Sequence, residues 1–363
     1  MKTTMKRFAS VLLAISMIIV FSSSVIVGAV EDIAATDTAE YYIEYDYVNQ
    51  TYNRIPIDSI PDYAEMTTNT YELSGMASEL PRLLAINEAL TADTGISTFS
   101  NIDDDGYTIT SPTTDPYSGV VLILSKVTYT NGTETQEEWM RGTGFMVAPD
   151  VMVTAGHNIV QYKDGEFASM EVRIYYTYNI GTTNPVNTTT DYILPLMWTC
   201  YDYSDAMIET NGNDGVQASL QSDWCVVQLQ EPITNVYNFS CEMGVSTSIF
   251  TTYCVSGYPY CIAPTCTDNN CLNNANLNHI ESFIQCTSEG KIRKKNNYMA
   301  FFTNNTRKGM SGGPVYKKSN YVCYAIDTCE DPENVFGSEY EGYNGGTIIN
   351  DKIYNAIAYY IER

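Results

Sequence analysis

The chain has 363 residues, with 43 Asp and Glu against 19 Lys and Arg, so its formal net charge is −24. Such an acidic chain would repel a phosphate backbone, which argues against nucleic-acid binding. Its length is sufficient for one large domain with a further segment.

Residues 1–29 have the features of an export signal. Three basic residues open the stretch, 11–21 is a nearly continuous apolar core, and small residues at 27–29 suit cleavage. The apolar core is too short for a membrane span, and no later stretch reaches about 18–20 uninterrupted apolar residues. We therefore expect a secreted, extracellular protein with no membrane attachment once the signal is removed.

Residues 30–106 differ from the rest of the chain in charge, with 16 acidic residues against two arginines and no cysteine. They contain a strand-like stretch at 41–47 and a run at 78–90 with apolar residues at helical spacing. The polar tail, 93–106, ends in three aspartates and a glycine, which is typical of an exposed linker. We predict an acidic propeptide that is removed by cleavage within 93–106. The alternative is a small N-terminal domain that is retained.

From residue 118 the pattern changes to short β-branched and aromatic runs, separated by Gly, Pro, Asn and Asp turns. The runs are 119–127, 142–147, 151–155, 172–178, 224–229, 252–256, 280–286, 299–302, 314–316 and 321–326. Their spacing is typical of an all-β barrel or sandwich. The C-terminus predicts one amphipathic helix, capped by Asn350. Its apolar face would be Ile353, Ala356, Ile357, Tyr360 and Ile361.

All ten cysteines lie between Cys200 and Cys329. In an exported chain they indicate disulfide bonds, whose pairing the sequence leaves open. Five of them crowd into 254–286, with His279 nearby, so a metal cluster is the alternative. The spacings lack the short Cys-x-x-Cys pairs of zinc sites, so we expect no metal. We interpret His279 as structural or as a surface residue.

Near the C-terminus, residues 309–314 read Gly-Met-Ser-Gly-Gly-Pro. A serine between glycines can sit on a tight turn with its hydroxyl exposed. The backbone N–H groups of Gly309 and Ser311 can then point to one spot beside that hydroxyl. An acyl-transfer nucleophile needs this arrangement, since the two donors stabilise the oxyanion of the transition state. An ordinary Gly-Ser loop is the alternative.

A base and a carboxylate suited to this serine lie upstream. His157, one of two histidines, follows the apolar run 151–155, so a rigid element would present its imidazole. Asp223 stands just before the run 224–229, where a partly buried carboxylate can orient an imidazole. Rival carboxylates lie in polar loops: Asp202, Asp205 and Asp214. We therefore predict a triad of Ser311, His157 and Asp223.

These residues resemble chymotrypsin-like (trypsin-like) serine proteases, and within them the bacterial glutamyl-endopeptidase (V8-like) branch. The motifs occur in the family's order over roughly 115–360. They are Gly142-Thr143-Gly144-Phe145, Thr154-Ala155-Gly156-His157, Asp223-Trp224, Gly257-Tyr258-Pro259, Gly290-Lys291-Ile292 and Gly309-Met310-Ser311-Gly312-Gly313-Pro314-Val315.

The resemblance implies an all-β protease domain over 107–363, made of two six-stranded antiparallel β-barrels with a C-terminal α-helix. It implies Ser311 as nucleophile, His157 as acid and base, and Asp223 as the group that orients the imidazole. The N–H groups of Gly309 and Ser311 would form the oxyanion hole. We expect protein or peptide substrates, a monomer and no cofactor.

Two positions depart from the pattern. Met310 replaces the acid that pairs with the new N-terminus in many trypsin-like enzymes, and the glutamyl-specific branch differs from trypsin there as well. Asp327 stands where glutamyl endopeptidases carry a histidine that helps to bind the substrate carboxylate, although Thr306 matches their pocket threonine. The residues assigned to the substrate pocket are Thr306, Asp327, Asn305 and Thr328.

An acid in that pocket should repel a substrate Glu and favour Lys, Arg or uncharged side chains. Arg307 and Lys308 are close enough in sequence to neutralise it, which would leave Glu specificity open. The leading hypothesis is a secreted serine endopeptidase made as a zymogen. The alternative is a catalytically silent homologue that binds a partner. An α/β-hydrolase esterase is rejected, because His157 precedes the serine and no parallel α/β pattern is present.

Overall fold

A computed structural model of the chain describes residues 41–68, 106–131, 134–160, 162–163, 166–167, 169–176, 192–201, 222–259, 284–330 and 336–363. The predicted signal at 1–29 and the helical run at 78–90 lie outside the described residues, as does the predicted linker except for Gly106. The same holds for Asp202, Asp205, Asp214 and His279.

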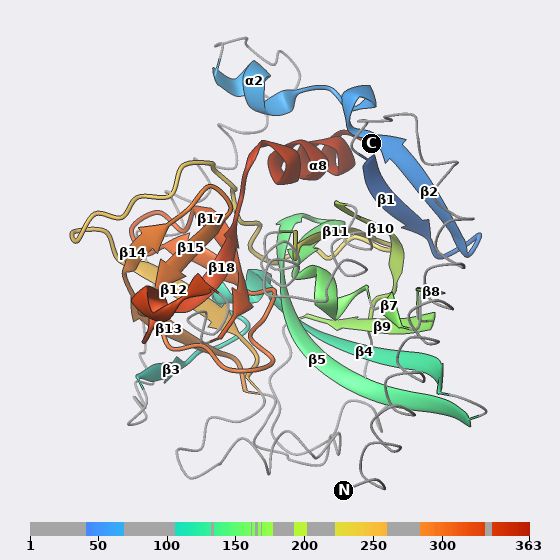
Figure 1. The fold of residues 1–363 in the computed structure, drawn as a ribbon, viewed down its shortest axis with the longest axis horizontal. Helices are drawn as coiled ribbons and strands as arrows, with labels where there is room; N and C mark the ends of the chain where they lie inside the picture. The colour runs from blue at the N-terminus through green and yellow to red at the C-terminus, as the bar shows by residue number, and fades with distance from the viewer. Residues whose placement is uncertain are drawn as a thin grey trace, which may run out of the picture. The chain divides into compact units, whose positions relative to one another are not determined.

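The first of two eight-stranded antiparallel sheets in the described residues has the strand order β2-β1-β10-β11-β6-β5-β4-β9 (Figure 1). Its strands are β1 (Tyr41–Asp46), β2 (Thr51–Pro56), β4 (Val120–Asn131), β5 (Glu134–Ala148), β6 (Val151–Thr154), β9 (Ser169–Tyr175), β10 (Pro195–Tyr201) and β11 (Cys225–Leu229). Ile174 of β9 and Ile193, two residues before β10, exchange backbone hydrogen bonds of 3.0 and 2.9 Å. The sheet therefore returns on itself, and six of these described strands close a barrel.

The second sheet has the order β14-β15-β18-β17-β16-β12-β13-β3. Its strands are β3 (Tyr107–Ile109), β12 (Tyr253–Gly257), β13 (Cys286–Gly290), β14 (Ile292–Lys295), β15 (Met299–Phe302), β16 (Pro314–Lys317), β17 (Cys323–Cys329) and β18 (Asn344–Ile348). Because only Lys291 separates β13 from β14, the two act as one bent strand that pairs with β12 and then with β15. This strand closes the second six-stranded ring, so the predicted double barrel is confirmed.

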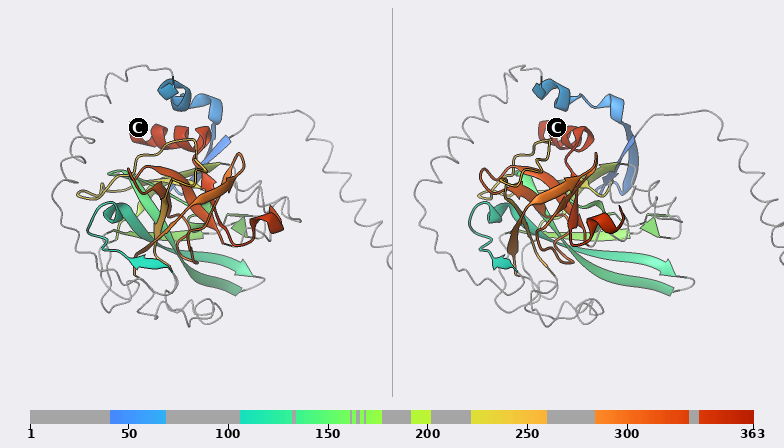
Figure 2. Two further views of the ribbon diagram at one scale, coloured as in Figure 1. Left: turned by 90° about the vertical axis from the view of Figure 1, so that its left-hand side faces the viewer. Right: turned by 60° about the vertical axis from the view of Figure 1, so that its left-hand side comes forward.

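The remaining described elements are short, apart from the C-terminal helix. They are η1 (Ile57–Ser59), α2 (Tyr63–Thr68), η3 (Tyr117–Gly119), η4 (Gly156–Asn158), β7 (Tyr162–Lys163), β8 (Glu166–Phe167), η7 (Ser338–Tyr340) and α8 (Asp351–Glu362). Figure 2 shows α8 beside the α2 segment in both of its views. As predicted, Asn350 caps α8, and its side chain accepts a hydrogen bond of 3.0 Å from the Ile353 N–H.

Strand β4 shows why the barrels form. Side chains alternate between the two faces of a strand. Val121 and Ile123 lie in the hydrophobic cluster inside the first barrel. Val120, Leu122 and Leu124 lie in the cluster that α8 also enters. Apolar side chains on both faces of this strand are therefore buried, and the strand joins the two clusters.

Backbone pairing defines the described strands, including some that the sequence did not predict. Of the run predicted at 280–286, residues 280–283 lie outside the described residues, Ile284 and Gln285 are not in a strand, and Cys286 begins β13. The pairing of Cys286 with Gly257 of β12 marks that start. The sequence also gave no signal for β18, which contains two glycines, or for β14, which is largely basic. Each of these strands pairs with β15, and backbone hydrogen bonds to that strand hold it in the extended conformation.

The described cysteines show no disulfide bond, so the disulfide prediction stays a prediction. Cys225, Cys241, Cys254 and Cys323 are free thiols. Cys241 and Cys323 lie opposite each other in a parallel bridge. Three members of the cysteine-rich stretch, Cys261, Cys266 and Cys271, lie outside the described residues. Among the described residues, no cluster of His, Cys, Asp and Glu could hold a metal ion.

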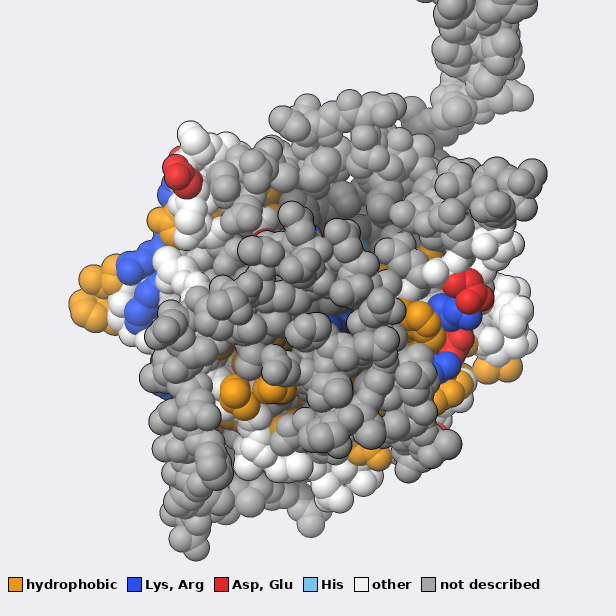
Figure 3. Space-filling model, turned by 90° about the horizontal axis from the view of Figure 1, so that it is seen from below, with side chains coloured by type: hydrophobic (Ala, Val, Ile, Leu, Met, Phe, Trp, Pro, Cys, Tyr) orange, Lys and Arg blue, Asp and Glu red, His pale blue; other side chains and the backbone are white. Residues whose placement is uncertain are grey.

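The described surface carries charges of both signs. In Figure 3, Lys and Arg side chains lie next to Asp and Glu side chains at the right-hand edge. Ion pairs of this kind include Lys126–Glu137, with 2.8 Å between Nζ and Oε1, and Arg173–Glu171, with 2.5 Å between Nη2 and Oε1. No helix in the described ranges is long and apolar enough to cross a membrane.

One buried amide joins the barrels. Gln285, at the start of β13, is 1% exposed. Its Nε2 donates to the carbonyl oxygens of Tyr117 and Val120, at 3.0 and 3.2 Å, and to the Tyr258 hydroxyl at 3.1 Å. Its Oε1 accepts from the Thr110 hydroxyl at 2.7 Å. The side chain thus ties the second barrel to the chain that enters β4.

We expect Gln285→Leu to lower the free energy of unfolding by about 2–5 kcal/mol, because it leaves several buried polar groups without a partner. Urea denaturation followed by tryptophan fluorescence measures this change. The matched control is Gln230→Leu, at an exposed glutamine. Equal urea midpoints for the two variants would show that the amide does not hold the barrels together.

Candidate active site

The position of His157 follows from strand β6. All four residues of β6 are buried, and the strand pairs with β5 on one side and β11 on the other. The chain then turns through η4, which contains His157. A side chain at the end of so constrained a strand has little positional freedom. The imidazole is 33% exposed, so one part of it faces solvent while the rest is packed.

Asp223 reaches His157 because β11 and β6 are neighbours. Cys225 is paired with Thr154, so the residues just before β11 lie beside those just after β6. The Oδ2 atom of Asp223 is 2.7 Å from Nδ1 of His157. Its Oδ1 atom accepts a hydrogen bond of 2.9 Å from the His157 backbone N–H. Because the carboxylate holds both the ring and the backbone of His157, it can fix the tautomer with the proton on Nδ1.

The carboxylate also sets the charge state of the imidazole. Burial by itself lowers the pKa of His157. The charge of Asp223 and its hydrogen bond act in the opposite direction and prevail, so the pKa lies above its ordinary value. Asp223 is only 2% exposed. Its negative charge is therefore poorly screened by water, which strengthens its effect on the ring.

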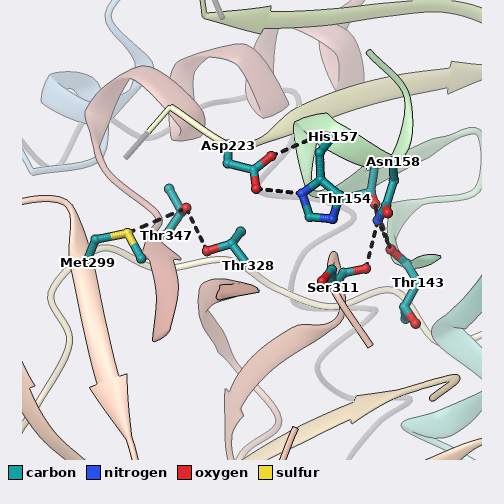
Figure 4. A network of polar contacts seen from close by, with 9 residues as sticks. All are labelled: Thr143, Thr154, His157, Asn158, Asp223, Met299, Ser311, Thr328 and Thr347. Carbon is teal, nitrogen blue, oxygen red and sulfur yellow. Dashed lines mark hydrogen bonds and ion pairs between the residues drawn. The ribbon is translucent and has the colours of Figure 1, made fainter. Parts of the chain in front are cut away.

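Ser311 lies in the loop that precedes β16, in the second barrel. Gly309 and Gly312 on either side of it have φ of +94° and +90°, a region that favours glycine. A Cβ atom at Gly312 would lie 2.0 Å from the carbonyl oxygen of Thr143, so no other residue fits there. In Figure 4, Asp223 and Ser311 lie on different sides of the His157 ring. The structure thus brings the three predicted triad residues together.

Two residues of the first barrel hold Ser311 in place. The backbone N–H of Thr143 donates a hydrogen bond of 2.9 Å to the Ser311 carbonyl oxygen. The side-chain amide of Asn158 donates to the same oxygen at 2.7 Å and to the Thr154 hydroxyl at 3.0 Å (Figure 4). The Thr143 hydroxyl donates to the Gly309 carbonyl at 2.7 Å.

These anchoring roles were not predicted from the sequence. Thr143 and Thr154 belong to motifs that carried the family resemblance, so that resemblance was the available signal. Asn158 follows the histidine directly and had no signal of its own. Its amide contacts a carbonyl that lies 153 positions away in the chain.

The backbone around Ser311 leaves donors available. Within the described ranges, the N–H groups of Gly309 and Ser311 donate no hydrogen bond. The N–H groups of the neighbouring residues are used. That of Met310 donates a hydrogen bond of 2.9 Å to the Arg307 carbonyl, and that of Gly312 donates one of 2.7 Å to the Asp327 carbonyl. The Met310 side chain is fully buried in the core of the second barrel. Two unused donors flanking a serine can stabilise an oxyanion.

The predicted pocket residues have different surroundings. Thr306 is 8% exposed, and its hydroxyl has no hydrogen-bond partner among the described residues. Asn305 is exposed, and its N–H bonds the Ser288 hydroxyl at 2.8 Å. The Thr328 hydroxyl lies 3.3 Å from that of Thr347, between β17 and β18.

Asp327 is the unusual member of the predicted pocket set. It is 3% exposed, and its Oδ1 has no partner in the described part of the chain. Burial, followed by the nearby charge of Glu330, raises the pKa of Asp327 well above its ordinary value. No ion pair joins Asp327 to Arg307 or Lys308 among the described residues, and the Arg307 guanidinium lies 5.7 Å from the centre of the Tyr107 ring.

Comparison with known proteins supports the motif-based resemblance. No family model matches the chain. It is 24% identical over 258 residues to the glutamyl endopeptidase of Bacillus licheniformis, a match that covers 69% of this chain. The match spans 66% of that relative, slightly less than two thirds of its length.

A solved structure of a Glu endopeptidase in complex with MPD is 18% identical, with a TM-score of 0.48. That match covers 72% of this chain and 99% of the solved one. By its sequence match to the Bacillus licheniformis enzyme, the chain resembles chymotrypsin-like serine proteases of the glutamyl-endopeptidase branch, as its motifs indicated.

Proposed function

We propose that the protein is a secreted serine endopeptidase, made as a zymogen, that hydrolyses peptide bonds through Ser311, His157 and Asp223. The observation that carries the proposal is the 2.7 Å contact between Nδ1 of His157 and Oδ2 of Asp223, with Ser311 anchored beside the ring. The sequence similarity to a glutamyl endopeptidase supports the same reaction class. The export signal expected at 1–29 supports secretion.

In the proposed mechanism, Oγ of Ser311 attacks the carbonyl carbon of the scissile bond while Nε2 of His157 takes its proton. Asp223 stabilises the imidazolium that forms. The N–H groups of Gly309 and Ser311 donate to the developing oxyanion. His157 then protonates the leaving amine, and an acyl-enzyme remains. Water, activated by the same imidazole, releases the acyl group and restores the serine.

We further propose that the pocket favours a basic or uncharged substrate side chain over glutamate. A buried carboxyl group without a hydrogen-bond partner is stabilised most by a cation that donates a hydrogen bond to it, because charge-assisted hydrogen bonds are the strongest kind. A guanidinium or ammonium group would satisfy Oδ1 of Asp327 and return that residue to its charged form. A substrate carboxylate would instead meet a second carboxyl group, and the pair would have to share a proton. The Thr306 hydroxyl, which has no hydrogen-bond partner among the described residues, would add a further polar contact for the substrate side chain.

The reaction class is tested with a fluorophosphonate probe, which reacts covalently with activated serines, and with a peptide library. We expect labelling and cleavage by the processed wild-type protein and neither by Ser311→Ala, since the nucleophile is gone. The control is Ser319→Ala, at an exposed serine on the turn after β16. Absence of labelling from a folded, processed wild-type protein would favour the silent binding homologue.

The pH profile of kcat/KM tests the His157–Asp223 pair. The base must be neutral, and its pKa is raised, so activity should appear as the pH rises through a value above about 6.5. In Asp223→Asn the carboxylate no longer raises the pKa while burial still lowers it. The acidic limb should therefore move to lower pH, and kcat should fall about 10⁴-fold. An unchanged acidic limb in the variant would contradict the assignment of Asp223.

Substitution of the pocket acid tests specificity. We expect Asp327→Asn to lower kcat/KM about 10- to 100-fold for substrates with Arg or Lys before the cut bond, because a charged hydrogen bond is lost. Substrates with Ala or Leu there should change little. Asp351→Asn, at an exposed aspartate, is the control. Cleavage that is confined to Glu-X bonds and unaffected by Asp327→Asn would contradict the specificity proposal.

A further inference from the structure

The described part of the acidic N-terminal region, residues 41–68, extends the first barrel. Strand β1 pairs with β10 over five residues, from Tyr42–Tyr201 to Asp46–Met197. Just beyond the strand, the Tyr47 N–H bonds the Leu196 carbonyl at 3.1 Å. The backbone groups at this edge of β10 are thereby satisfied by residues that the sequence assigned to a propeptide.

Strand β1 is buried on both of its faces. The Tyr42 side chain, 0% exposed, enters the cluster shared with α8, and its ring meets the Trp224 ring edge-on at 5.9 Å. The next residue, Ile43, points the other way and joins the interior cluster of the first barrel, beside Trp198. A strand with both faces in the core is not a surface attachment, because its removal would expose apolar side chains of two clusters.

Polar contacts fasten the same strand to the C-terminal end of the chain. Glu44 is 5% exposed, and its Oε2 accepts hydrogen bonds from the Tyr360 hydroxyl at 2.7 Å and from Nη1 of Arg363 at 2.8 Å. Burial and the Glu44 carboxylate raise the pKa of Tyr360, so its hydroxyl remains a donor. The Tyr42 hydroxyl donates to the carbonyl of Lys352, in α8, at 2.8 Å.

A second element of the segment, α2, packs against the same helix. The Asn355 side chain accepts a hydrogen bond of 2.8 Å from the Ala64 N–H and donates one of 3.1 Å to Oδ1 of Asp62. Helix α8 in turn contacts β6 and β11, the two strands that end and begin beside His157 and Asp223. Residues 41–68 therefore support the helix that lies behind the proposed triad.

We propose that residues 41–68 remain in the active enzyme as a non-covalently bound light chain after the precursor is cut within 93–106. This inference rests on the processing included in the proposed function. Retention is non-covalent because 30–106 contains no cysteine. In this proposal residues 41–68 stay bound to the surface formed by β10, Trp224 and α8, and cleavage of the precursor does not release them.

The test uses the full chain carrying Ser311→Ala, which cannot cleave itself, with a recognition sequence for a site-specific protease inserted within 93–105. The protein is folded first and cut afterwards. We expect the N-terminal fragment to co-elute with the body on gel filtration in buffer and to separate from it only in guanidinium chloride. A fragment that elutes apart in buffer, from a body that keeps a cooperative thermal transition, would overturn the proposal.

Glu44→Gln provides a second, quantitative readout on the cut protein. Loss of the charged contacts with Tyr360 and Arg363 should speed dissociation of the fragment about 10-fold. The expected increase is no larger because solvent screens the part-exposed Arg363 and weakens its contact with Glu44. Asp58→Asn, at an exposed aspartate of the same segment, should change the rate less than about two-fold. Equal rates for the two variants would mean that the Glu44 contacts do not retain the segment. Because neither readout uses catalysis, failure of the proposed protease activity would be recognised separately.

Discussion

The backbone carbonyl of Ser311 is the point on which the candidate site depends. It accepts hydrogen bonds from Thr143 and Asn158, which both belong to the first barrel, whereas Ser311 belongs to the second. His157 and Asp223 are fixed by neighbouring strands of a single barrel, so their contact follows from sheet pairing. The serine has no such connection. These cross-barrel bonds, together with the buried Gln285, tie its loop to the barrel that carries the imidazole.

Two buried aspartates show how surroundings decide what the same side chain can do. Asp223 is 2% exposed and accepts hydrogen bonds from the backbone and ring of His157. Asp327 is 3% exposed, yet its Oδ1 finds no donor in the described part of the chain, and its pKa is raised. The first is suited to a fixed electrostatic role. The second is the group that we propose meets a substrate cation, because the described residues give its Oδ1 no partner.

The two ends of the described chain meet behind the site. Strand β1 lies against β10, and its Glu44 binds Arg363, the last residue. Helix α8 is thus enclosed between the barrel strands and residues 41–68. The N-terminal region is the most acidic part of the sequence, but specific contacts rather than overall charge hold it in place. Its buried Glu44 accepts hydrogen bonds from Tyr360 and Arg363. The position of Trp224, next to Asp223, links this packing to the proposed triad.

Local sequence determined the elements whose signal is contained in a few neighbouring residues. The glycines around Ser311 permit its turn, the apolar runs beside His157 and Asp223 form strands, and the 350–361 pattern forms a capped helix. Tertiary structure decided the rest. The start of β13, the strand conformation of β18, the anchoring by Asn158 and the docking of β1 on β10 all depend on partners far away in the chain. Such contacts leave no periodicity in the sequence, because the energy that favours them arises only when distant segments have already come together.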